Sequence, residues 1–256
     1  MDLVVVHGGA ITKRYYEPLA KRLAGRVNVH LYNRRGREEA GPRPPGYTVD
    51  DEIADLAAVL ERTGARSVLG HSFGGLVVMR AALELPLDAI VLYDGTVNVD
   101  NVFPTAYIPQ MRAYVDAGDI PRALAVMSGG LNLGGLPFGV RVAMCRLFLK
   151  TPVGKMMGGL LPGTMLETEE VAATPTTAAD YSGVTARTLL IAGARSGHYY
   201  RTMNDRLAAA MPDARTHVLA GAGHNEPCRG RPALADLVAG FLAGAPAKPG
   251  PGPARS

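Results

Sequence analysis

The stretch Leu69–Leu76, "LGHSFGGL", is the most informative part of this sequence. It places Ser72 between Gly70 and Gly74, directly after a short apolar run and directly before a helix-forming segment. A serine exposed on a sharp strand-to-helix turn needs neighbours without bulk, which is the physical content of the pattern Gly-x-Ser-x-Gly. Free backbone N–H groups at the helix start would face any negative charge that develops beside the serine. The stretch therefore predicts that Ser72 is a nucleophile at the end of a buried strand.

Apolar runs and amphipathic segments alternate on both sides of this stretch, as expected for buried strands connected by helices. The expected strands are 3–6, 27–32, 67–69, 89–93, 188–192 and 216–219, and the expected helices are 14–24, 49–63, 74–85, 200–211 and 232–242. Such alternation predicts a parallel sheet with helices on both faces. We therefore expect an α/β fold with a mostly parallel, doubly wound sheet of about six strands.

The alternation stops between residues 97 and 183, a segment with no clear strand that contains six of the ten methionines. We expect a core made of residues 1–96 and 184–243, a mainly helical lid at 97–183, and a disordered Pro/Gly-rich tail at 244–256. Because ligands bind at the carboxyl ends of parallel strands, the lid should cover a site there. Methionine adapts to irregular apolar shapes, so Met111, Met127 and Met144 are candidate substrate contacts. The alternative is that they pack between helices.

Composition restricts the class of protein. The 256 residues are 47% hydrophobic and 20% charged, as in globular proteins, and no run of 18 uncharged apolar residues predicts a membrane span. The start, "MDLVVVHGG", lacks a basic region and resembles a first strand rather than a signal peptide. Cys145 and Cys228 match no disulfide framework or metal-ligand spacing, which favours free thiols in a reducing compartment. The prediction is a cytoplasmic protein, and the Arg-rich, small-residue composition suggests a bacterial source.

No cofactor, metal or nucleic-acid partner is predicted. The net charge is +4, but no Arg/Lys cluster alternates with aromatic residues as a nucleic-acid surface would require. No glycine-rich phosphate loop and no metal-ligand motif occurs. The expected partner is a small apolar substrate, and the sequence does not indicate an oligomeric state.

A serine hydroxyl needs a base, and His224 is the best candidate. It lies in "GAGHNE", after the last expected strand and before the last helix, where the base falls in a Ser–acid–His chain order. The alternative is a solvated loop histidine. His198 lies in a loop at the same expected sheet edge and is a candidate pocket residue. His71, next to the serine, is expected to pack or to form hydrogen bonds.

Four motifs, "VHGG", "YNRRGREEAGP", "GHSFGG" and "GAGHNE", resemble those of the α/β-hydrolase fold superfamily over residues 2–243. Many members carry the catalytic acid after the strand that precedes the penultimate helix, but Arg195 and Ser196 occupy that position here. Others carry it one strand after the nucleophile strand, which corresponds to Asp94 in "VLYDG". The resemblance therefore implies Asp94 as the acid that orients His224. The open alternatives are Asp100, Asp205, Glu226, or no acid at all, with Asp94 capping a turn.

The same resemblance implies an oxyanion hole made of two backbone N–H groups. One belongs to Phe73, the residue after the nucleophile. The other comes from "HGGA" after the first strand, where Gly9 is the preferred donor and Ala10 the alternative. The arginines of the second motif, Arg34, Arg35 and Arg37, are expected to be structural.

The implied function is a serine hydrolase that cleaves an ester, thioester or lactone of an apolar small molecule through an acyl-serine intermediate. Fold does not dictate function, so two other hypotheses stay open. One is a non-hydrolytic enzyme of the same fold, a cyclase or lyase acting on an apolar metabolite. The other is a binding protein without catalysis, which the presence of both Ser72 and His224 disfavours.

Overall fold

A computed structural model describes residues 1–131 and 135–244. Its centre is one six-stranded sheet in the order β2-β1-β3-β4-β5-β6, and every neighbouring pair is parallel. The strands are β1 (Asp2–Val6), β2 (Asn28–Leu31), β3 (Ser67–His71), β4 (Ala89–Tyr93), β5 (Arg187–Gly193) and β6 (Ala214–Leu219). The predicted parallel, doubly wound sheet is confirmed. The strand order reverses between β1 and β3, and ligands bind beside such a reversal.

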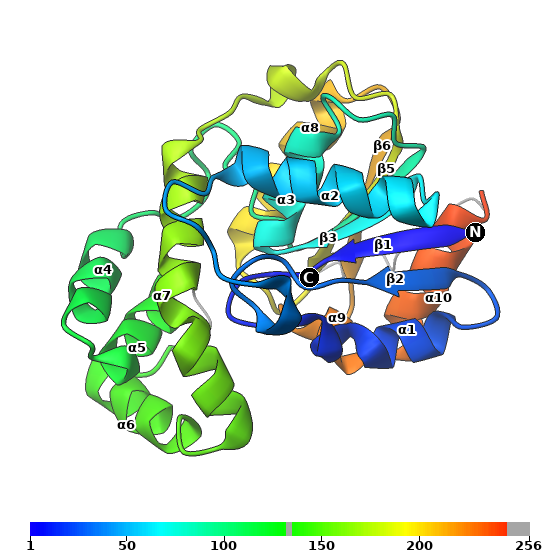
Figure 1. The fold of residues 1–256 in the computed structure, drawn as a ribbon. Coiled ribbons are helices and arrows are strands. Elements are labelled where there is room, and N and C mark those ends of the chain that lie inside the picture. The colour runs from blue at the N-terminus through cyan, green and yellow to red at the C-terminus, as the bar shows by residue number, and fades with distance from the viewer. Residues whose placement is uncertain (132–134, 245–256) are drawn as a thin grey trace.

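Helices cover both faces of the sheet, as Figure 1 shows. One face carries α2 (Val49–Thr63), α3 (Phe73–Ala81) and α8 (His198–Ala210), and the other carries α1 (Glu17–Leu23) and α10 (Pro232–Leu242). Side chains alternate between the faces of a strand. Accordingly, Val4 and Val6 of β1 belong to the first core, whereas Leu3 and Val5 belong to the second.

Short helical segments fill several connections: η1 (Lys13–Tyr16), η2 (Glu38–Ala40), η3 (Ala178–Tyr181) and α9 (Glu226–Arg229). The longer α2 has the bounds that the sequence predicts. Thr48 and Asp51 form a reciprocal capping box at its start, and Gly64 ends it with φ 66°. That left-handed conformation is costly for residues with a Cβ atom, so glycine ends the helix cleanly.

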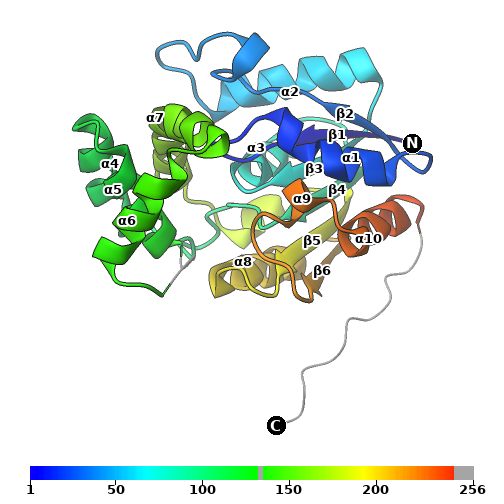
Figure 2. The same cartoon turned by 90° about the horizontal axis from the view of Figure 1, so that it is seen from below.

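Residues 97–183, called the helical insertion below, connect β4 to β5. They contain α4 (Ile108–Asp116), α5 (Ile120–Gly130), α6 (Phe138–Phe148) and α7 (Pro152–Ala173), with a single isolated β-bridge, Val99 to Thr176, in the described residues. The four helices share a separate apolar core that includes Met111, Leu161 and Met165. Figures 1 and 2 place this insertion beyond the carboxyl end of β1, next to the strand ends. The tail expected to be disordered lies, from residue 245 onward, outside the described residues.

None of the helices within residues 1–131 and 135–244 is long and apolar enough to cross a bilayer.

Candidate active site

Ser72 occupies a strained turn between β3 and α3. Its φ of 53° and ψ of −124° are unfavourable for a residue with a side chain, and such strain is typical of functional sites. A Cβ atom at Gly74 would lie 2.1 Å from the Val6 carbonyl oxygen, and one at Gly70 would lie 2.7 Å from the Gly74 carbonyl oxygen. Both glycines are therefore required because backbone passes directly against them. The turn holds Ser72 half-buried at the wall of a cavity.

His224 follows β6 and is oriented by a carboxylate. Its Nδ1–H donates to Oδ2 of Asp94 at 3.1 Å, since the carboxylate can only accept. In the neutral ring this leaves Nε2 free to accept a proton. Ser72 and His224 line the same cavity, although no hydrogen bond joins them in the described part of the chain. Catalytic hydrogen bonds of this kind often tighten only when substrate binds.

Asp94 lies at the carboxyl end of β4 and is fully buried. The Gly193 N–H donates to its Oδ1 at 3.0 Å, and the Ser196 hydroxyl donates to its Oδ2 at 2.5 Å. Arg195, by contrast, is exposed. The hydrogen bonds from Gly193, Ser196 and His224 compensate the burial of the Asp94 carboxylate.

The three alternative acids lie elsewhere. Asp100 pairs with Arg206 at 3.0 Å, Glu226 pairs with Arg231, and Asp205 is exposed. None of the three is among the described residues that line the cavity. Of the candidates from the sequence, the structure brings Asp94 to His224.

A chain of hydrogen bonds connects the residue before the nucleophile to two loops. Burial lowers the pKa of His71 well below its ordinary value, so the ring is neutral. Its Nε2–H donates to the His224 carbonyl oxygen at 2.9 Å, because a carbonyl can only accept. Its Nδ1 then accepts from the Tyr16 hydroxyl at 2.6 Å, and that oxygen accepts from the Gly8 N–H at 3.2 Å. The chain holds the Gly8 loop, the turn and the His224 loop in one arrangement.

Two further tyrosines support the His224 loop. The Tyr93 hydroxyl donates to the Gly223 carbonyl oxygen at 2.9 Å, and the Tyr200 ring stacks on the His224 ring at 5.4 Å with planes 14° apart. None of the sequence motifs indicates a role for Tyr16, Tyr93 or Tyr200. Tyr93 directly precedes Asp94 in "VLYDG", but no sequence pattern links any of the three tyrosines to the His224 loop, and only the closing of the sheet brings them to the site.

Gly9 and Ala10, in the loop after β1, are the two candidate oxyanion-hole donors, and only one of their N–H groups is free to bind a ligand in the described part of the chain. The Ala10 N–H donates to Thr164 Oγ1 at 2.8 Å. The Gly9 N–H donates to no protein acceptor in residues 1–131 and 135–244, and neither does the Phe73 N–H at the start of α3. Gly9 and Phe73 also line the cavity. They are thus able to bind an oxygen of a ligand.

The cavity has a volume of about 150 Å³ and lies between the strand ends and the helical insertion. The core contributes Gly8, Gly9, Ala10, Ile11, His71, Ser72, Phe73, Thr96, Tyr200, His224 and Asn225, and the insertion contributes Phe103, Tyr107, Met127, Leu131, Met157, Thr164, Glu167, Thr168 and Val171. The insertion therefore supplies one wall, and that wall is mainly apolar.

The candidate substrate contacts are only partly found at this cavity. Ala10 and Met127 line it. Met111 is fully buried, because it faces the other helices of the insertion. Met144 is 56% exposed on α6, and His198 is exposed at the start of α8. These three side chains are not among the described residues of the cavity wall, where substrate contacts were expected.

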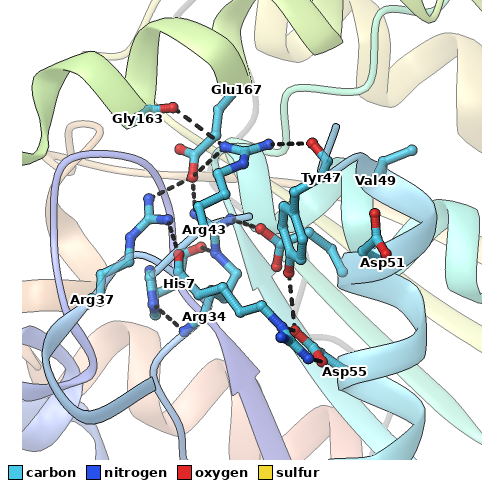
Figure 3. A network of polar contacts seen from close by, with 12 residues as sticks. His7, Arg34, Arg37, Arg43, Tyr47, Val49, Asp51, Asp55, Gly163 and Glu167 are labelled. Atoms are coloured by element: carbon cyan, nitrogen blue, oxygen red, sulfur yellow. Dashed lines mark hydrogen bonds and ion pairs between the residues drawn. The ribbon is translucent and has the colours of Figure 1, made fainter. Parts of the chain in front are cut away.

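A buried ion cluster joins the insertion to the core beside this cavity (Figure 3). Arg34 contacts Oε1 of Glu52 at 2.6 Å and Oε1 of Glu167 at 2.9 Å, and all three side chains are at most 1% exposed. Arg37 reaches the same Glu167 oxygen at 2.5 Å. The arginines of the second motif thus include two structural ones, as predicted. Their carboxylate partner on α7 is too distant in sequence to be inferred from the motif.

Comparison with known proteins gives the class to which this fold and site belong. The sequence matches the alpha/beta hydrolase family over residues 3–237. The chain therefore belongs to the alpha/beta hydrolase family. A crystal structure of an alpha/beta hydrolase from Sphaerobacter thermophilus DSM 20745 is 28% identical, covers 94% of this chain and 92% of its own, and has a TM-score of 0.77.

Two curated relatives are ester hydrolases by name. The sn-1-specific diacylglycerol lipase ABHD11 of Danio rerio is 30% identical over 130 residues, which are 48% of this chain and 41% of that protein. The pimeloyl-acyl-carrier-protein methyl ester esterase of Aliivibrio salmonicida strain LFI1238 is 31% identical over 90 residues, which are 33% of this chain and 31% of that protein. This chain spans less than half the length of each of these relatives.

Proposed function

We propose that this protein is a serine hydrolase that cleaves an ester-type bond in a small, mainly apolar molecule through an acyl-serine intermediate. The observation that carries the proposal is the contact between His224 Nδ1 and Asp94 Oδ2 at 3.1 Å. It leaves Nε2 of His224 as a base in the cavity that Ser72 lines. The ester hydrolases among the relatives agree with this class of reaction.

In the proposed reaction, Ser72 Oγ attacks the substrate carbonyl carbon while His224 Nε2 accepts the hydroxyl proton. Asp94 stabilises the resulting imidazolium. The Gly9 and Phe73 N–H groups donate to the oxyanion of the tetrahedral intermediate. Its collapse breaks the bond to the alcohol, thiol or ring oxygen, which takes the proton from His224.

Water then hydrolyses the acyl-serine by the same steps. His224 removes a proton from water, the hydroxide attacks the acyl carbon, and Ser72 leaves with the proton. The helical insertion acts as the lid of this site in our proposal. Its apolar wall excludes water from the oxyanion and accepts an apolar acyl group, while the cavity of about 150 Å³ favours a small one.

The test combines active-site labelling with kinetics. A small fluorophosphonate should form an adduct on Ser72, found by mass spectrometry, in the wild type and not in His224→Ala. Hydrolysis of p-nitrophenyl butyrate should fall by about 10⁴-fold or more in Ser72→Ala, since triad residues act as a unit. Activity that survives in Ser72→Ala but is lost in His224→Ala would refute the acyl-serine and favour base-catalysed cyclisation or elimination.

A further inference from the structure

One oxygen of Glu167 lacks a partner although the residue is buried. Glu167 lies on α7 and is 1% exposed. Its Oε1 accepts from Arg34 and Arg37, whereas its Oε2 has no hydrogen-bond partner within the described residues. Burying a carboxylate oxygen without a hydrogen-bond donor costs free energy, and most such oxygens in folded proteins have a partner.

The unpartnered oxygen is buried beside the active-site cavity. Glu167 is part of the cavity wall, and a Cβ atom built on Gly9 would lie 2.9 Å from Glu167 Oε2. The oxygen therefore lies next to the residue whose N–H we assign to the oxyanion hole. The neighbouring hydroxyls of Thr164 and Thr168 donate to the carbonyl oxygens of Leu160 and Thr164. Neither threonine supplies a proton to Glu167.

The charge of the cluster limits what can bind there. Burial raises the pKa of Glu167, but Arg34 and Arg37 more than offset this and hold it below its ordinary value. Glu167 is therefore an anion that only accepts hydrogen bonds. Three guanidinium groups, those of Arg34, Arg37 and Arg43, surround two carboxylates. This excess of positive charge disfavours a cationic donor and favours a neutral one, such as a hydroxyl.

We propose that Glu167 Oε2 determines specificity by accepting a hydrogen bond from a hydroxyl on the acyl part of the substrate. The preferred substrates are then esters, thioesters or lactones of short hydroxy acids. The acyl side is assigned because Glu167 contacts the loop after β1, whereas His224, which protonates the leaving group, follows β6. This inference rests on the proposed function, because it takes Ser72 as the nucleophile.

The experiment compares three esters of equal chain length: p-nitrophenyl butyrate, 3-hydroxybutyrate and 3-methoxybutyrate. For the wild type, kcat/KM should be roughly 10- to 100-fold higher for the hydroxy ester than for the methoxy ester, since the methoxy group cannot donate. Equal rates, or a preference for the methoxy ester, would overturn the inference without any variant being made.

Glu167→Gln then tests the residue itself. Arg34 and Arg37 only donate, so they should retain the amide oxygen and turn the NH₂ group toward the cavity. A donor then replaces the acceptor. Both the hydroxyl and the ether oxygen can accept from it, so the preference for the hydroxy ester over the methoxy ester should be lost. Glu52→Gln is the matched control, because it neutralises a partner of the same Arg34 but is not part of the described cavity wall. Its selectivity should stay that of the wild type. A hydroxy preference that persists in folded Glu167→Gln would refute the assignment.

Ser72→Ala separates the two proposals. If none of the three esters is hydrolysed in a Ser72-dependent way, the proposed function fails, and the inference fails with it. If hydrolysis depends on Ser72 but the hydroxy ester has no advantage, the inference alone fails.

Discussion

The hydroxyl of Ser196 donates a hydrogen bond of 2.5 Å to Oδ2 of Asp94, the oxygen that also accepts from His224 at 3.1 Å. Asp94 follows β4, and Ser196 follows β5. These strands are adjacent, with Tyr93 opposite Ile191 in the register. Side chains after either strand therefore reach the same point beside His224.

Asp94→Asn should lower kcat/KM for p-nitrophenyl butyrate by about 10⁴-fold, because an amide does not hold His224 in the tautomer that leaves Nε2 free. The measurement is steady-state hydrolysis at neutral pH. Asp205→Asn, at an exposed residue outside the described cavity wall, is the control and should retain normal rates. Full activity in Asp94→Asn would show that another group orients the base.

A carboxylate at residue 196 should partly replace the one at residue 94. In the double variant Asp94→Asn/Ser196→Asp, we expect kcat/KM to recover by at least about 10-fold over Asp94→Asn, because the acid restores the imidazolium partner. The single variant Ser196→Asp is the comparison. It places two carboxylates together and should not gain activity. No recovery in the double variant would mean that residue 196 does not reach His224 productively.

Gly74→Ala should destabilise the fold by about 3 kcal/mol or more, because the added Cβ would lie 2.1 Å from the Val6 carbonyl oxygen and the backbone would have to shift. Gly163→Ala is the matched substitution. It lies within α7 with nothing within 4 Å of the added atom, so it should be neutral or stabilise by up to about 1 kcal/mol. Urea unfolding measures both. Similar stabilities for the two variants would contradict the close approach at the turn.

Arg34→Ala should lower the free energy of unfolding by about 3–5 kcal/mol, because it leaves the buried carboxylates of Glu52 and Glu167 without their shared partner. Its neighbour provides the control. Arg35 pairs with Asp55 while 46% of its own side chain is exposed, so Arg35→Ala should cost less than about 1 kcal/mol. Denaturant titration of both variants checks the contrast. A small effect at Arg34 would mean that the cluster contributes little to the stability of the fold.

Acid should destabilise the protein through two buried histidines. Burial lowers the pKa of His7 and of His71 well below the ordinary value of 6.5. Below that value the unfolded chain binds two protons that the folded protein does not, so stability is present above about pH 6.5 and is lost as the pH falls.

The loss should be at most about 3 kcal/mol between about pH 7.5 and about pH 5.5, measured by urea unfolding. His71→Asn should roughly halve this fall, whereas His198→Asn, at an exposed residue, should not change it. Unfolding free energies that are constant over this range would show that the buried rings are protonated in the folded protein.

Local patterns were sufficient for the fold because each depends on neighbouring residues. The predicted helices 49–63 and 232–242 and the strand 89–93 have the same bounds in the structure. Ser72, His224 and Asp94 could be proposed because each follows a strand, and parallel strands bring their carboxyl ends to one edge. Periodicity did not indicate where the methionine side chains point, because it does not say which neighbour a helix face packs against. Met111 and Met144 both lie on helices of the insertion, but one faces other helices and one faces solvent.

The sequence by itself determined the parallel sheet, the strained serine turn and the set of candidate catalytic side chains, since short-range sterics and hydrophobic period encode these features. Only the tertiary structure decided that Asp94 contacts His224, that Tyr16 connects Gly8 to His71, and that Glu167, in the cavity wall, has one oxygen without a partner among the described residues. The physical reason is distance along the chain. The Asp94–His224 and Arg34–Glu167 contacts join residues 130 and 133 positions apart, and such partners are selected by the packing of whole elements rather than by any local pattern.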